Sequence, residues 1–135
     1  MSRPTPFFIE VQPGDTRPLG RQIIDSVRRQ IAAGDLPVGA LLPSVRVLAQ
    51  QLTINPNTVA KAYADLCSEG WLESRPGLGL FVAEARERLS RTEQQRRLDQ
   101  ACGRFVDEVL GLDFTSEEIV KRLRAELQPY RARRA

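Results

Sequence analysis

In the first half of the chain, apolar residues recur every three or four positions, which is the spacing of helices with one buried face. The first such stripe lies within residues 17–33, where Thr16 is a candidate cap and Gly34 is a stop. The apolar run before it, residues 7–11, alternates weakly and predicts a short strand or an extended arm. The stripe that ends before Gly34 predicts a first helix over residues 17–33.

Two shorter apolar stripes follow, separated by only a few residues. Ser44 opens the first of them, a predicted helix over residues 45–52. Asn55 and Pro56 predict the start of the second, because a capping side chain precedes a residue whose φ is already helical, and Gly70 ends it. Two short helices this close together, each with one apolar stripe, are typical of a helix-turn-helix.

Beyond the third helix, two short apolar runs flank a turn rich in proline and glycine. The runs are residues 71–74 and 80–82, and the turn spans residues 75–79. Such a pattern predicts a β-hairpin. Three helices followed by a hairpin form a winged helix-turn-helix, which we expect to occupy residues 1–83. The fold class is therefore mainly α with one small β-hairpin.

The second half of the chain is more polar and predicts further helices. Residues 84–100 are dominated by Arg, Glu and Gln. Thr115 and Glu118 have the spacing of a capping box, which predicts the start of a last helix. We expect residues 84–128 to be a helical region and residues 129–135 to be a flexible basic tail.

Neither helix of this second region carries enough apolar surface to form a core of its own. Because their stripes have no evident partner within the chain, we expect them to pair with a second copy and form a homodimer. A compact monomer, in which they cover the winged helix, is the alternative. The positions expected at the dimer interface are Leu98, Cys102, Phe105, Val106, Val109, Ile119 and Leu123.

The composition argues against several classes of function. The chain of 135 residues contains no histidine, which removes the commonest general base and most zinc sites. The lack of histidine therefore predicts a protein that is not an enzyme and requires no metal or cofactor. No apolar run approaches the roughly 20 residues of a membrane span, so we expect a cytoplasmic protein without a membrane partner. Cys67 and Cys102 lie in apolar helical patterns and are expected to be buried, reduced thiols.

The overall charge is only mildly basic. The formal net charge is +3, and residues 1–83 hold eight basic and seven acidic side chains. So small an excess is compatible with nucleic-acid binding but does not predict it. A basic surface must therefore arise from the placement of individual side chains.

Several spaced motifs occur in a fixed order across residues 17–83. They are the segments LPVG at 36–39, LPSVRVLA at 42–49, NTV at 57–59, GWL at 70–72 and GLGLFV at 77–82. Together they resemble the signature of the GntR family of bacterial transcription regulators. The remaining half is too short for the large effector domains of other branches and is similar to the YtrA-like branch, whose short C-terminal helices dimerise. The resemblance implies a homodimeric repressor bound to a double-stranded DNA operator, and it leaves an unidentified small-molecule effector open.

On the predicted third helix, Asn57, Thr58 and Lys61 lie away from the apolar stripe. Asn suits adenine, Thr a thymine methyl or a phosphate, and Lys guanine or the backbone, so these side chains are candidates to contact DNA. Asn55 is interpreted first as a helix cap, with a DNA contact as the alternative.

Ser44 and Arg46 open the second helix and are candidates to bind phosphates, because a helix N-terminus presents free amides and a favourable dipole. The resemblance adds that the matching arginine of the family contacts DNA. The alternatives are a helix cap for Ser44 and an ion pair with Asp35 or Asp65 for Arg46.

Arg75 and Gly77 of the predicted hairpin turn are candidates for the minor groove, since glycine lets the backbone approach closely and arginine is drawn to its negative potential. A plain tight turn with an exposed arginine is the alternative. Tyr63, Trp71 and Phe81 are expected in the core.

Two wings in a dimer suit a pseudo-palindromic operator with half-sites about one helical turn apart. A winged helix used for protein-protein assembly, without sequence-specific DNA binding, is the alternative function. The polar and basic character of the predicted outer face argues against it, because protein interfaces favour apolar and aromatic anchors.

Overall fold

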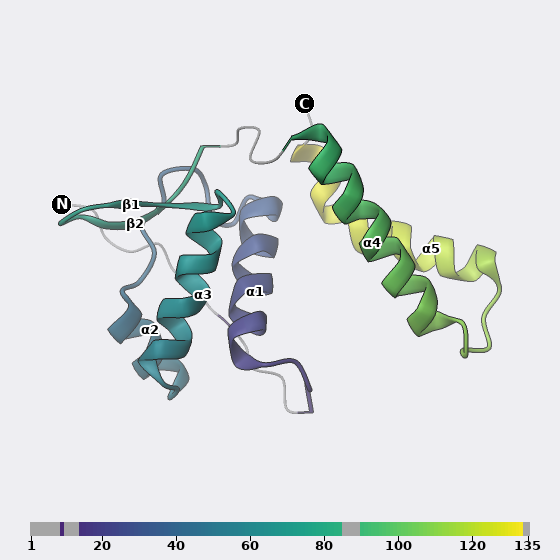
Figure 1. Cartoon of the computed structure of the whole chain (residues 1–135), viewed down its shortest axis with the longest axis horizontal. Helices are drawn as coiled ribbons and strands as arrows, with labels where there is room; N and C mark the ends of the chain where they lie inside the picture. The colour runs from purple at the N-terminus through teal and green to yellow at the C-terminus, as the bar shows by residue number, and fades with distance from the viewer. Residues whose placement is uncertain (1–8, 10–13, 85–89, 134–135) are drawn as a thin grey trace. The chain divides into compact units, whose positions relative to one another are not determined.

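The computed structural model describes residue 9, residues 14–84 and residues 90–133. Its elements, in chain order, are α1 (Leu19–Ala33), α2 (Val45–Leu52), α3 (Pro56–Ser68), β1 (Leu72–Arg75), β2 (Gly79–Val82), α4 (Arg91–Val109), α5 (Ser116–Leu127) and the 3-10 helix η1 (Gln128–Arg133) (Figure 1). The chain divides into two compact units, residues 1–86 and residues 87–135. Three helices followed by an antiparallel hairpin confirm the expected fold class.

In the first unit, α1, α2 and α3 pack around one apolar core. Its fully buried side chains include Val27 from α1, Leu48 from α2, and Val59 and Leu66 from α3. Figure 1 shows α1 and α3 side by side, as the packing between them requires. Of the segment 7–11, only Ile9 is described, and it is buried, while the rest of this prediction lies outside the described residues.

Local capping explains why α2 and α3 begin where they do. The Ser44 hydroxyl accepts a hydrogen bond from the Val47 N–H at 3.2 Å, and the Asn55 side-chain oxygen accepts one from the Asn57 N–H at 2.8 Å. Both starts match the prediction. Between the helices, Thr53 adopts the left-handed conformation with a φ of 55° and closes the turn.

The start of α1 differs from the prediction. The helix begins at Leu19, with Pro18 at the N-cap position and no side-chain cap, so Thr16 does not cap it. Proline suits this place because the first N–H groups of a helix have no partner within the helix. The preceding turn is stabilised instead by Asp15, whose carboxylate accepts a hydrogen bond from the Arg17 N–H at 2.9 Å.

The hairpin is joined to the loop that precedes α2. Strands β1 and β2 pair with Leu72 opposite Val82 and Arg75 opposite Gly79. The N–H of Leu42 donates to the Leu80 carbonyl at 2.9 Å, and other backbone bonds connect residues 39–40 to Val82 at the same distance. The hairpin is therefore tied by its backbone to the segment leading into α2.

Tyr63 connects α3 to the residue before Ser44. It is buried, and its hydroxyl donates to the Pro43 carbonyl at 2.9 Å. Burial raises the pKa of this hydroxyl, so it stays protonated and remains a donor. The hydrogen bond thus fixes the approach to α2 against the core.

Tyr63→Phe should lower the free energy of unfolding by about 1–2 kcal/mol, because the buried Pro43 carbonyl loses its donor. Urea denaturation monitored by circular dichroism measures this change. Tyr130→Phe is the matched control, since the Tyr130 hydroxyl donates to no residue that the structure describes. Equal denaturation midpoints for Tyr63→Phe and the unmodified chain would contradict the assignment.

In the second unit, one helix begins later than predicted and the other begins where the capping box predicts. Helix α4 begins at Arg91, not at residue 84, because the Ser90 hydroxyl caps it by accepting from the Glu93 N–H at 3.1 Å. Glu84 is not helical, and residues 85–89 lie outside the described residues. Helix α5 begins after Thr115, whose hydroxyl accepts from the Glu118 N–H at 3.1 Å, as the capping box predicts.

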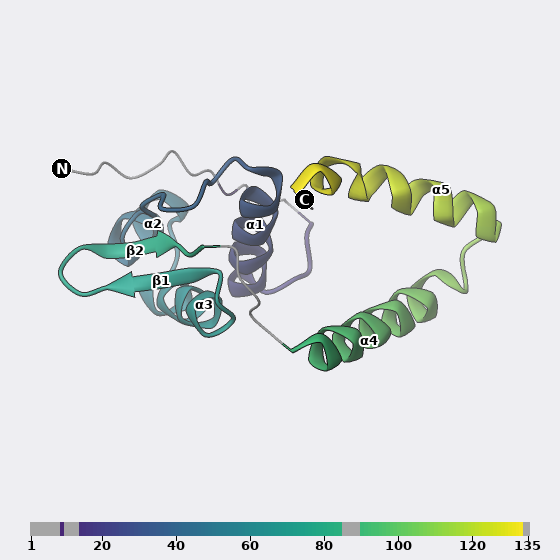
Figure 2. The same ribbon diagram turned by 90° about the horizontal axis from the view of Figure 1, so that it is seen from above.

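Helical structure also extends past residue 128, where the predicted helical region ends. Residues 128–133 form η1, so helical structure continues past Pro129. Proline lacks an N–H, but the first turn of a helix does not use its N–H groups within the helix. Pro129 is therefore compatible with the first turn of η1. Figure 2 shows α4 and α5 diverging from the loop that joins them. Neither helix contains a buried residue.

Candidate nucleic-acid interface

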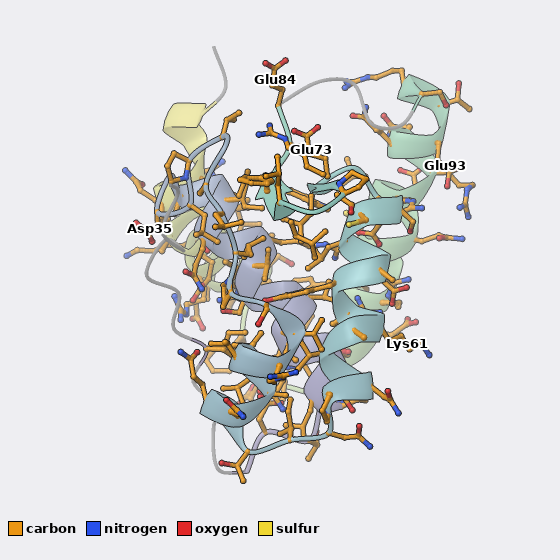
Figure 3. All side chains as sticks on the ribbon, turned by 90° about the vertical axis from the view of Figure 1, so that its left-hand side faces the viewer. Asp35, Lys61, Glu73, Glu84 and Glu93 are labelled. Atoms are coloured by element: carbon orange, nitrogen blue, oxygen red, sulfur yellow. The ribbon has the colours of Figure 1, made fainter. Side chains whose placement is uncertain are left out.

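The outer face of α3 carries the polar side chains that the sequence pattern selects. Asn57 and Lys61 are exposed, and Thr58 is half-buried, whereas Val59 and Tyr63 face the core. Figure 3 shows Lys61 on the side of α3 away from the core. The side chains of Asn57 and Lys61 form no hydrogen bond or ion pair with any residue that the structure describes. They are therefore free to bind a ligand.

At the start of α2, Ser44 and Arg46 are both exposed. The Ser44 oxygen accepts from Val47, which supports the capping interpretation, yet its O–H remains a donor that a phosphate could accept. Arg46 forms no ion pair with Asp35, Asp65 or any other described residue. The alternative of a surface ion pair for Arg46 is therefore not realised.

Asn55 acts as a helix cap, as the first interpretation holds. Its side-chain oxygen accepts the Asn57 N–H and keeps a second lone pair, and its amide N–H groups remain available for another partner. It is exposed and lies beside Asn57 at the N-terminal end of α3. A contact of Asn55 with DNA is therefore compatible with its role as a cap.

The hairpin turn is a type II turn. Pro76 and Gly77 occupy its two central positions, and the Leu78 N–H donates to the Arg75 carbonyl at 2.9 Å. Gly77 has a φ of +75°, a backbone conformation that residues with a β-carbon rarely adopt. A β-carbon on Gly79 would lie 3.0 Å from Leu41 Cδ1, so this position also favours glycine.

The wing arginine is held against the hairpin rather than free. Arg75 Nη2 donates to Glu73 at 2.6 Å, and its guanidinium carbon lies 4.3 Å from the centroid of the Phe81 ring. Sequence reasoning missed Glu73, although side chains two residues apart in a strand share a face and can meet. The side chain of Arg75 is still 47% exposed, so one part of its guanidinium remains open to solvent.

A groove lies between α1 and α3, with a volume of about 520 Å³. Its lining includes Gly20 and Arg21 from α1 together with Asn57, Thr58 and Lys61 from α3. Arg21 was not among the residues selected from the sequence, because the register of two packed helices has no local sequence signal. The structure thus adds a second helix to the surface that carries the candidate DNA contacts.

The predicted dimer positions in the second unit are exposed or half-buried in the single chain. An apolar cavity of about 490 Å³ lies between α4 and α5, lined in part by Phe105, Val109, Ile119 and Leu123. Cys102 is exposed, so the expectation that it is buried is wrong for the single chain. The other expected interface positions, Leu98 and Val106, are also exposed.

The arginines near the start of α4 are engaged within their own helix. Glu93 accepts from Arg96 at 2.5 Å and from Arg97 at 3.2 Å. These hydrogen bonds lower the pKa of Glu93 to about 2. Intrahelical ion pairs therefore account for these two arginines without a nucleic-acid partner.

Two observations limit the kinds of site in the described part of the chain. None of its helices combines the length and apolar character needed to cross a bilayer. The same residues contain no group of three or more side chains placed to hold a metal ion.

The chain resembles known proteins over both of its halves. The sequence profile described as "Bacterial regulatory proteins, gntR family" matches residues 19–82. The HTH-type transcriptional regulator YhcF of Bacillus subtilis, itself uncharacterized, is 32% identical over 106 residues, which cover 78% of this chain and 87% of YhcF. The chain belongs to the GntR family.

Further relatives place this GntR regulator beside YtrA proteins. The HTH-type transcriptional repressor YtrA of Bacillus subtilis is 40% identical over 77 residues, 57% of this chain and 59% of that relative. The solved structure of YtrA from Sulfolobus acidocaldarius, a GntR-family transcription factor, has a TM-score of 0.56 and 30% identity, covering 70% of this chain and 97% of that one. The protein is thus a YtrA-like GntR transcriptional regulator with a winged helix-turn-helix that binds DNA.

Proposed function

We propose that the protein is a repressor that binds, as a homodimer, to a pseudo-palindromic DNA operator. The observation that carries this proposal is the outer face of α3, where Asn57 and Lys61 are exposed and have no partner in the described chain. The repressor role is supported by the name of the Bacillus subtilis relative YtrA, a transcriptional repressor.

In this proposal α3 enters the major groove. Asn57 binds an adenine through its amide, Thr58 contacts a thymine methyl or a phosphate, and Lys61 donates to guanine or to the backbone. The N-terminal half of α3 carries all three residues, and recognition helices present their base contacts from this part.

The other contacts fix the orientation of α3. Ser44 and Arg46 donate to phosphates from the start of α2, and Asn55 donates through its amide N–H groups. Arg75 and Gly77 bring the wing to the minor groove, where the glycine turn allows close approach and the arginine meets the negative potential. Phosphate contacts of this kind make binding strongly salt-dependent, so a slope near zero for log affinity against log salt would refute the proposal.

The second copy is proposed to bind to the apolar surfaces of α4 and α5. The two helices have no buried residue in the single chain, and an apolar cavity lies between them. Burial of such surface is the main driving force of protein association. Two winged helices related by a twofold axis then bind two half-sites.

Asn57→Ala should lower the affinity for the operator by about 5- to 100-fold, while leaving the affinity for random duplex DNA nearly unchanged, because a bidentate base contact carries specificity. The operator is first isolated by selecting bound fragments of genomic DNA, and affinities are then measured by fluorescence anisotropy. Ser68→Ala is the control, since Ser68 is exposed at the other end of α3. Equal losses on both DNAs would show that Asn57 does not read bases.

A gel shift with random duplex DNA at low salt separates this proposal from protein-protein assembly. A DNA-binding winged helix retards the duplex through its phosphate contacts. If even high concentrations leave the duplex unshifted, the polar face of α3 has another partner.

A further inference from the structure

Helices α1 and α3 run side by side in the same direction. A β-carbon on Gly20 would lie 3.8 Å from Thr58 Cγ2 near the start of both helices, and Arg28 forms an ion pair with Glu69 beyond their middle. Figure 1 shows the two helices side by side. The groove between them therefore begins beside the N-terminal end of α3, where the candidate base contacts lie.

Arg21 is a cation that lines this groove. Asp25, one helical turn further along α1, is the acid best placed to pair with it. Asp25 instead accepts from Arg17 at 2.6 Å, and Arg17 also pairs with Asp15 at 2.7 Å. Arg21 is exposed and forms no ion pair with any residue that the structure describes.

Lys61 supplies a second cation to the groove, from α3, and it forms no ion pair within the described part of the chain. Asp65, the acidic residue among the lining residues, follows Lys61 by one turn but forms no ion pair with it. This order, with the cation nearer the N-terminus, is the weaker orientation for a helical pair. The groove therefore carries two positive charges, Arg21 from α1 and Lys61 from α3, and neither of them pairs with Asp65.

We infer that this groove binds the sugar-phosphate backbone of DNA beside the bases that α3 contacts, with Arg21 donating to a phosphate. This inference rests on the proposed function and extends the DNA-binding surface to α1. A phosphodiester carries one negative charge and accepts well from a guanidinium. Because Asn57, Thr58 and Lys61 line the same groove, a strand in contact with them passes Arg21.

The test compares two arginines of the same helix. Arg21→Ala removes the groove cation, and Arg29→Ala removes an arginine that is also exposed and unpaired among the described residues but does not line the groove. Both variants lose one positive charge, so any general effect of net charge is the same in each. Binding is measured by anisotropy on the selected operator and on a random duplex of equal length, over a range of salt concentrations.

Arg21→Ala should lower affinity for both DNAs by about 3- to 10-fold per protomer and reduce the slope of log affinity against log salt by about 0.9 for each phosphate that the variant no longer neutralises. Arg29→Ala should stay within about twofold of the unmodified chain, and Arg21→Lys should retain most of the affinity because it keeps the charge. Thermal unfolding midpoints verify that all variants fold, and Arg21→Lys against Arg21→Gln provides the comparison if alanine disturbs the helix.

Equal affinities for Arg21→Ala and Arg29→Ala would overturn the inference, while leaving the proposed function intact. A loss confined to the operator would also overturn it, because a phosphate contact is independent of base sequence. If the unmodified chain binds no DNA at all, the proposed function fails first and the inference falls with it.

Discussion

With Phe105 replaced by glutamate, the protein should sediment as a single chain of 15.2 kDa, and its affinity for the operator should fall by about 100-fold or more. Phe105 lines the apolar cavity between α4 and α5 and is 36% exposed in the single chain. Arg122 also lines the cavity but already pairs with Glu126, so a buried carboxylate at position 105 costs several kcal/mol, which a modest apolar interface does not offset. Each monomer then binds one half-site alone and loses the added affinity that comes from two linked winged helices binding together.

Leu110→Glu is the matched control for this experiment. Leu110 is apolar and 74% exposed, but it is not one of the expected interface positions and does not line the cavity, so its replacement should leave the dimer intact. Analytical ultracentrifugation at micromolar concentration measures the mass, and anisotropy measures binding to the operator. A monomeric mass for the unmodified chain would contradict the proposed dimer directly.

The second large effect is expected at Arg46. Arg46→Ala should weaken binding to operator and random DNA by the same factor, about 10- to 100-fold for each protomer, because each protomer loses a charge-assisted hydrogen bond to phosphate. The reason lies in its position: it is exposed at the start of α2 and has no ion pair with a described residue. Arg46→Lys keeps the positive charge and should retain most of the affinity that Arg46→Ala loses.

Anisotropy titrations on the two DNAs, repeated over a range of salt concentrations, measure this effect. The salt slope should become shallower by about 1.8 for the dimer, at about 0.9 for each phosphate that is no longer neutralised. A drop in operator affinity alone would mean that Arg46 reads a base. In that case the roles proposed for Arg46 and Asn57 would have to be exchanged.

Local chemistry made much of the fold predictable. Ser44 and Asn55 are capping residues, and Pro56 fixes the first turn of α3, so the starts of α2 and α3 follow from a few neighbouring residues. The start of α4 carries a signal of the same kind, because Ser90 and Glu93 have the capping-box spacing that predicts the start of α5, but sequence reasoning missed it.

The candidate site was predictable where it depends on one element. The apolar stripe of α3 places Asn57 and Lys61 on the opposite face, and the structure agrees. The positions of Arg21 and Thr58 across a shared groove depend on the register between two helices, which the sequence pattern does not contain. The restraint of Arg75 by Glu73 and Phe81 depends likewise on pairing between strands.

The backbone bonds between residues 39–42 and β2 have a consequence for operator choice. They couple the wing to the entrance of α2, so the hairpin cannot swing independently of the helix-turn-helix. The protein then fixes the distance along the DNA between the base-pair step that the wing contacts and the bases that α3 contacts. Operators with an inserted base pair at that point would be rejected even when every contacted base is correct.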